Sequence, residues 1–187
     1  MNTENSIKYL DFCHQLANAA DKISMPSFVE QKNLTIEKKT DGSFVTQADK
    51  HIEEHLSAMI NSKFPSHGFF GEETAHKNAE SDFKWIIDPI DGTHGFMRGM
   101  PIWATLIALE YNQEIITSMI SAPALGSRWW AAKNHGAFKS FKEQISKIEV
   151  STISQISESH ILFTGIKECL KKWPKFQIIL NQAWRER

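Results

Sequence analysis

The chain has 187 residues, of which 41% are hydrophobic and 23% charged, and its formal net charge is −1. This length can bury one good core, or one domain and part of a second. The near-zero charge without a basic run argues against nucleic acid as a main partner, and no apolar stretch is long enough to span a membrane. The first ten residues are too polar for a signal peptide, and the only two cysteines, Cys13 and Cys169, lie far apart. We therefore expect free thiols and a cytoplasmic location.

The N-terminal third of the chain predicts two helices around a short strand. Residues 5–29 carry apolar side chains at helical spacing, and residues 34–38 are typical of a strand. Thr46 then begins a helix that reaches residue 64. Asp49, three residues after Thr46, completes a capping box, in which each side chain accepts a backbone N–H of the other residue.

Two acidic segments follow this helix. A short strand from residue 68 delivers Glu72, and the apolar run 83–87 indicates a buried strand. Pro89 has no N–H, so we expect it to end this strand and to place Asp88 and Asp91 together on a sharp turn outside the sheet. Carboxylates held that close repel each other unless a cation neutralises them, and Mg²⁺ prefers such oxygen ligands.

Gly92 and Thr93 directly follow these acids and offer backbone N–H groups and a hydroxyl, which are groups that bind phosphate oxygens. On the Asp-x-x-Asp spacing alone, an ordinary turn is the better interpretation, because Asp, Pro and Gly are common turn residues. His51 and His55 on the second helix match an inverted zinc-protease motif. Such a short motif often occurs by chance, and packing of this helix behind Asp49 already accounts for it, so we do not expect zinc there.

The second half of the chain is rich in β-strand patterns. Antiparallel strands followed by two helices predict an N-terminal α+β domain over residues 1–145, with metal-binding capacity, and the start of a C-terminal α/β domain over 146–187. The predicted strands are 105–111, 115–121, 128–133 and 161–164, and the predicted helices are 168–173 and 176–184.

The longer string Trp-x-x-Asp-Pro-Ile-Asp-Gly-Thr over residues 85–93, followed by Phe96 and Pro101, resembles the signature of the inositol monophosphatase superfamily of Mg²⁺-dependent phosphomonoesterases. The same superfamily carries Gly-Glu-Glu before this string, as residues 71–73 do here. The resemblance implies a layered α/β/α/β/α sandwich. It also implies roles for individual residues: the metal ligands would be Glu72, Asp88, the Ile90 carbonyl and Asp91; the catalytic residues Thr93, Asp49 and Glu72; and the phosphate-binding residues Asp91, Gly92 and Thr93.

Substrate choice within the superfamily has to come from residues outside the shared metal centre. Gly95, the Arg98-Gly99 pair and the string Arg128-Trp129-Trp130 resemble the histidinol-phosphatase branch. This resemblance implies hydrolysis of L-histidinol phosphate to L-histidinol, a step of histidine biosynthesis. The alternative substrate is inositol 1-monophosphate or another sugar phosphate.

The end of the sequence departs from the superfamily pattern. Nothing after Glu168 resembles the late Trp-Asp motif that supplies a further metal ligand, since Trp184 is followed by Arg185. We therefore expect a truncated member whose C-terminal part is incomplete. An unpaired strand edge and uncovered apolar residues would then favour self-association, for example as a homodimer. The alternative to an active phosphatase is a catalytically impaired fragment with a binding role.

Overall fold

The computed structural model describes residues 3–31, 34–40, 42–73, 76–160, 166–173, 175–178 and 181. The chain separates into two compact units, Met1–Ile148 and Glu149–Arg187, and each is described by itself. None of the described helices combines the length and the apolar character needed to cross a membrane. Cys13 and Cys169 are free thiols, as predicted.

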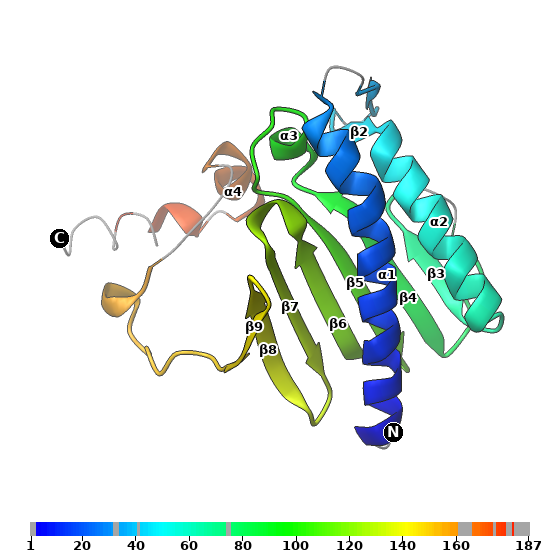
Figure 1. The fold of residues 1–187 in the computed structure, drawn as a ribbon. Coiled ribbons are helices and arrows are strands. Elements are labelled where there is room, and N and C mark those ends of the chain that lie inside the picture. Colours follow the sequence, from blue (N-terminus) through cyan, green and yellow to red (C-terminus); the bar gives the residue numbers. More distant parts are fainter. Residues whose placement is uncertain are drawn as a thin grey trace. The chain divides into compact units, whose positions relative to one another are not determined.

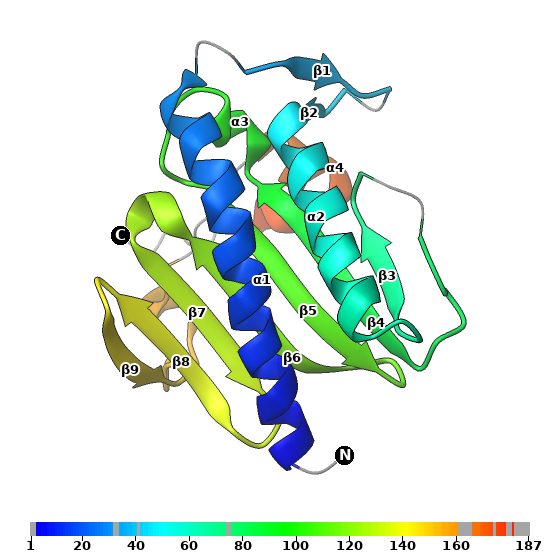
Figure 2. The same cartoon turned by 45° about the vertical axis from the view of Figure 1, so that its right-hand side comes forward.

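The first unit is a layer of two helices over a mixed β-sheet (Figures 1 and 2), so the predicted α+β class is confirmed. The helices α1 (Thr3–Val29) and α2 (Gln47–Lys63) cover one face of the sheet. The strand order is β3-β4-β5-β6-β7-β8-β9, with only the β3–β4 pair parallel. The strands are β3 (Gly68–Gly71), β4 (Phe83–Asp91), β5 (Ala104–Tyr111), β6 (Glu114–Ala122), β7 (Ser127–Ala132), β8 (Gly136–Phe141) and β9 (Gln144–Ile148).

Shorter elements complete the two units. A two-stranded hairpin joins α1 to α2, and a single-turn helix follows β4. The described part of the second unit includes the short helices η3 and α4. The strands β8 and β9 were not predicted from the sequence, whereas the predicted strand 161–164 and most of the predicted helix 176–184 fall outside the described residues. The short elements are β1 (Ile36–Lys38), β2 (Phe44–Thr46), α3 (Thr93–Phe96), η2 (Pro123–Leu125), η3 (Ile156–Glu158) and α4 (Ile166–Lys172).

One hydrophobic core lies between the helices and the sheet. Along β4 and β5 every second side chain faces the helices, as the pleat of a strand requires. Trp85 and Leu109 are fully buried on that face, and Leu16 of α1 and Leu56 of α2 are fully buried opposite them. This packing fixes the position of β4, and with it the acidic residues at the end of that strand.

The capping box predicted at the start of α2 is confirmed. The Thr46 hydroxyl accepts the Asp49 N–H at 3.3 Å, and the Asp49 carboxylate accepts the Thr46 N–H at 2.8 Å. The Thr46 hydroxyl also donates to the same carboxylate. Both residues are buried, so this box anchors the start of α2 next to the end of the sheet.

The prediction that Pro89 ends the strand is wrong. β4 continues to Asp91, and its pairing with β5 resumes after a bulge: Asp88 lies opposite Leu106 and Asp91 opposite Ala104. The missing N–H of proline is tolerated because the ladder is already interrupted at a bulge. Asp88 and Asp91 therefore lie within the strand rather than on a turn beyond it.

The bulge decides which way the two acids face. In a regular strand, residues three apart point to opposite faces of the sheet. Here two residues of β4 stand opposite one residue of β5, so Asp88 and Asp91 pair with Leu106 and Ala104, which lie two apart and share a face. Leu106 alternates with Thr105 and Ile107, which are buried beneath the helices, so both carboxylates lie on the face of the sheet that the helices leave uncovered.

On the covered face, a partly buried ion pair connects α1 to the sheet. The Arg128 guanidinium donates to the Asp21 carboxylate at 2.6 Å, to Ser121 Oγ at 3.1 Å and to Asn18 Oδ1 at 2.8 Å. Burial raises the pKa of Asp21, while Arg128 and Ser121 act in the opposite direction. Arg128 and Ser121 therefore stabilise the charged form of the Asp21 carboxylate against the effect of its burial.

Replacing Arg128 with Met should lower the free energy of unfolding by about 2 kcal/mol, because the Asp21 charge loses its partner while partly buried. Adding Asp21→Asn should recover part of that loss. The matched control is Lys133→Met, which breaks the more exposed pair with Glu114 and should cost less than about 1 kcal/mol. Urea denaturation measures all three, and equal losses for Arg128→Met and Lys133→Met would contradict this account.

Candidate active site

Acidic side chains gather where the parallel strands β3 and β4 end. Gly71 pairs with Ile87, so Glu72 and Asp88 follow at the same level of the sheet. Burial raises the pKa of Asp88, and the negative charges of Glu72 and Asp91 raise it further. The two strands thus bring together three of the residues predicted to hold a metal, at a cost in electrostatic repulsion.

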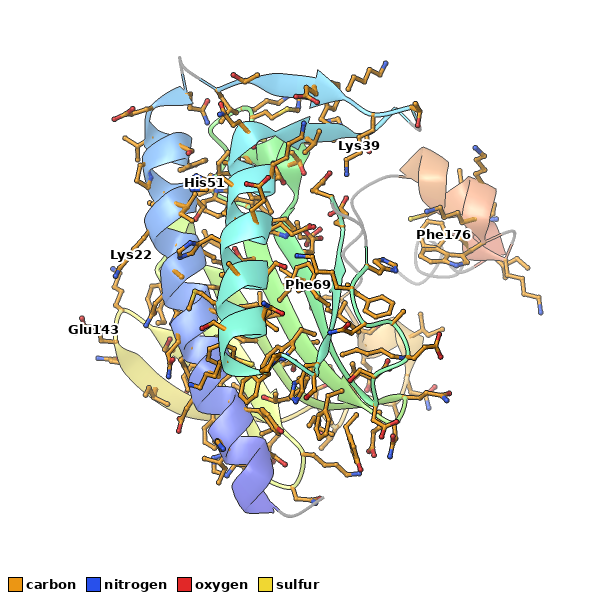
Figure 3. The ribbon with its side chains drawn as sticks, turned by 90° about the vertical axis from the view of Figure 1, so that its right-hand side faces the viewer. Lys22, Lys39, His51, Phe69, Glu143 and Phe176 are labelled. Atoms are coloured by element: carbon orange, nitrogen blue, oxygen red, sulfur yellow. The ribbon has the colours of Figure 1, made fainter. Side chains whose placement is uncertain are left out.

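Lys39, which follows β1, supplies a positive charge to this cluster (Figure 3). Its ammonium group lies 3.1 Å from Glu72 Oε1 and 2.6 Å from Glu73 Oε1. No hydrogen-bond partner is present for the buried Asp88 Oδ1 among the described residues. The cluster therefore already holds one positively charged group and has a carboxyl oxygen of Asp88 that is free to bind a metal cation.

These features fit a hard divalent cation. Carboxylate and carbonyl oxygens are its preferred ligands, and charge repulsion between carboxylates is what such an ion relieves. Among the described residues no three acidic, histidine or cysteine side chains are arranged as a finished metal site. Glu72 is paired with Lys39, so a bound cation would compete with the Lys39 ammonium for that carboxylate.

Thr93 lies at the first position of α3. Its hydroxyl donates to the Ile90 carbonyl at 3.1 Å. Burial raises the pKa of Asp49 to about 6, against the effect of its bonds to Thr46. The family resemblance also implies a hydrogen bond between Asp49 and Thr93. This bond stays a prediction, because the bonds described for these two side chains go to Thr46 and to the Ile90 carbonyl.

Gly92 makes the turn from β4 into α3 possible. Its φ is +85°, a conformation that other residues rarely adopt, and a Cβ there would lie 2.9 Å from the Ile102 carbonyl oxygen. Gln31 at the end of α1 donates to the Phe96 carbonyl at 2.8 Å and so fixes α3. Phosphate binding by the N–H groups of Gly92 and Thr93 stays a prediction.

Glu53 is a site residue that the sequence reasoning missed. Its side chain is fully buried on α2, and its carboxylate accepts the Glu73 N–H at 2.8 Å. It occupies the space where a side chain of Gly71 would lie, since a Cβ there would be 2.1 Å from Glu53 Oε1. The sequence contained one indication of this role: Glu53 lies four residues after Asp49, which places both carboxylates on the same buried face of the helix.

An open depression of about 660 Å³ adjoins the acids on the uncovered face of the sheet. Glu72 and Asp88 lie at its acidic end, while Ile86, Leu106 and Ile120 contribute apolar walls. The depression offers room for a small molecule next to the carboxylates.

Other residues singled out from the sequence lie elsewhere. His51 and His55 line a separate depression between α1 and α2, and no metal-holding group is found there among the described residues. Trp130 packs against His14 of α1, with ring centroids 5.0 Å apart, on the same face as Arg128. The side chains of Arg128 and Trp130 therefore face away from the acids. Arg98, which follows α3, donates to the carbonyl of His94 in α3 at 2.9 Å.

Comparison with known proteins agrees with the geometry. Residues 8–175 match the inositol monophosphatase family. The chain belongs to this family. It is 35% identical to the histidinol-phosphatase of Streptomyces coelicolor over 96% of the chain, which spans 70% of that relative.

Solved structures share the fold. The IMPase of Thermotoga maritima superposes with a TM-score of 0.73 at 27% identity, covering 90% of this chain and 65% of that protein. An IMPase/NADP phosphatase solved with Mg²⁺ and phosphate gives a TM-score of 0.61 at 26% identity, covering 74% of this chain and 52% of that one. The chain thus spans between about half and two thirds of the solved family members.

The contact between Gly71 and Glu53 gives a direct test of how the acidic cluster is built. Gly71→Ala should displace the Glu53 carboxylate and lower the free energy of unfolding by about 2 kcal/mol, since overpacking a buried site forces neighbours to shift. Combining it with Glu53→Ala removes the clashing carboxylate and should make the alanine at position 71 cost less. Thermal denaturation of the unaltered chain, the two single variants and the double variant tests this. If the stability losses of the two single variants simply add up in the double variant, the account is contradicted.

Proposed function

We propose that the chain is a Mg²⁺-dependent phosphomonoesterase that acts on a small phosphate monoester. The observation that carries the proposal is the bulge in β4, which directs Asp88 and Asp91 to one face beside Glu72 in a member of this family. The nearby depression provides space for the substrate.

The residues that would hold the metal are Glu72, Asp88 and Asp91, together with the Ile90 carbonyl. When bound, Mg²⁺ makes a coordinated water more acidic and offsets negative charge on the phosphate. Release of Glu72 from Lys39 would leave the Lys39 ammonium near the site, where it would attract the phosphate dianion.

Thr93 would position the attacking water. Its hydroxyl already bonds the Ile90 carbonyl, so its oxygen lies next to the proposed metal ligands. Asp49 and Glu72 would act as acceptors that orient Thr93 and the water in line with the leaving oxygen. The N–H groups of Gly92 and Thr93, with Asp91 beside them, would hold the phosphate.

L-histidinol phosphate is the substrate that we favour, and inositol 1-monophosphate is the alternative. Support comes from the similarity to a histidinol-phosphatase over 96% of the chain. Of the residues that resemble the histidinol-phosphatase branch, Arg128 and Trp130 pack against α1. Trp129 alternates with them and pairs with Ile120, a residue that lines the depression beside the acids. Gly95 and Arg98 lie in the segment directly after Asp91.

Two further expectations remain predictions. A cytoplasmic location is supported by the free thiols of Cys13 and Cys169. Self-association, for example as a homodimer, is supported by β9, the last described strand of the sheet, on which Ile145 is 67% exposed.

Asp88→Asn and Asp91→Asn should each lower the rate of phosphate release about 100-fold or more, because each removes a full ligand charge at constant volume. Asp82→Asn is the matched control: this exposed residue directly precedes β4, and its replacement should leave the rate unchanged. Phosphate release is measured with and without Mg²⁺. Full activity in EDTA, or near-normal turnover of Asp91→Asn, would refute the metal assignment.

Histidinol phosphate should have a higher kcat/KM than inositol 1-monophosphate when the two are compared at saturating Mg²⁺. Arg128→Met, which acts on the far face of the sheet, should leave the ratio of the two kcat/KM values unchanged even though it destabilises the protein. A higher kcat/KM for inositol 1-monophosphate would reverse our assignment of the substrate.

A further inference from the structure

Thr105 stands at the point where the acidic bulge meets the neighbouring strand. It is the single residue of β5 between Leu106 and Ala104, the partners of Asp88 and Asp91. It therefore lies opposite two residues of β4, Pro89 and Ile90. Its side chain is fully buried, and its hydroxyl donates to the Pro89 carbonyl at 2.8 Å.

This bond compensates for what the bulge removes from the ladder. Two residues opposite one cannot both pair through their backbones, and Pro89 has no N–H to contribute. A buried carbonyl without a donor is costly, and the Thr105 hydroxyl supplies one from the side chain. The bond fixes the direction of the Pro89 carbonyl, and thereby limits the rotation of the next peptide group, which carries the Ile90 carbonyl.

We propose that Thr105 is a positioning residue for the metal site, which holds the bulge so that the Ile90 carbonyl and the carboxylates of Asp88 and Asp91 converge on one cation. The inference rests on the proposed function for the identity of the ion. Its structural part, that the Thr105 hydroxyl sets the backbone of residues 89–91, does not depend on that function.

Three variants separate this role from a general effect on stability. Thr105→Val keeps the shape of the side chain and removes the donor, whereas Thr105→Ser keeps the donor. Thr117→Val is the matched control, because Thr117 is a buried threonine of the adjacent strand β6 whose hydroxyl donates to the Ala131 carbonyl at 3.1 Å, away from the bulge.

The first measurement is made on the metal-free full chain. Backbone chemical shifts of residues 89–91, which report the local dihedral angles, should change in Thr105→Val and stay near the unaltered values in Thr105→Ser and Thr117→Val. Unchanged shifts in Thr105→Val, or equal changes in Thr105→Ser, would overturn the inference.

The second measurement is Mg²⁺ binding by calorimetry. Thr105→Val should raise the Kd for Mg²⁺ about tenfold or more, which is the range found when partners that orient metal ligands are removed. Thr105→Ser should keep the Kd near that of the unaltered chain. Thr117→Val should lose stability without a change in Kd. An unaltered Kd in Thr105→Val would overturn the inference. If the unaltered chain shows no saturable Mg²⁺ binding, the proposed function is refuted, and the chemical shifts alone then test whether Thr105 sets the backbone of residues 89–91.

Discussion

Like charges held on one face of a sheet are the constraint around which this structure is arranged. The bulge in β4 places Asp88 and Asp91 on the same face, and the parallel pairing of β3 with β4 adds Glu72. Burial raises the pKa of Asp88, and the negative charges of Glu72 and Asp91 raise it further, so each carboxylate also raises the energy of the others. Such an arrangement is stable only where the rest of the fold holds the backbone in place and a cation neutralises the charge.

The surrounding structure supplies that support from several directions. Trp85 anchors β4 in the core beneath the helices, and Glu53 holds the backbone after Gly71 through the Glu73 N–H. Thr105 bonds the bulge itself, and Lys39 provides the neutralising charge when no metal is bound. Stability and function are therefore linked, because the groups that stabilise the strand ends also orient the proposed ligands.

The sequence predicted most of this arrangement where the signals were local. The capping box at Thr46 follows from two residues three apart, and helical spacing alone located α1 and α2. The strand beyond Pro89 was missed, because its continuation depends on pairing with β5, which no local pattern reveals. Glu53 was missed for a similar reason, since a glutamate in a helix is usually exposed and only the approach of Gly71 makes it buried.

The central claim is that one cation site forms between the ends of β3 and β4. Titrating the metal-free chain with Mn²⁺, which replaces Mg²⁺ and broadens nearby NMR signals, tests it most directly. We expect the amide signals of Glu72, of Asp88 and of residues 90–93 to broaden first, and excess Mg²⁺ to restore them. Broadening centred instead on His51 and His55, or spread evenly over the exposed carboxylates, would contradict the claim.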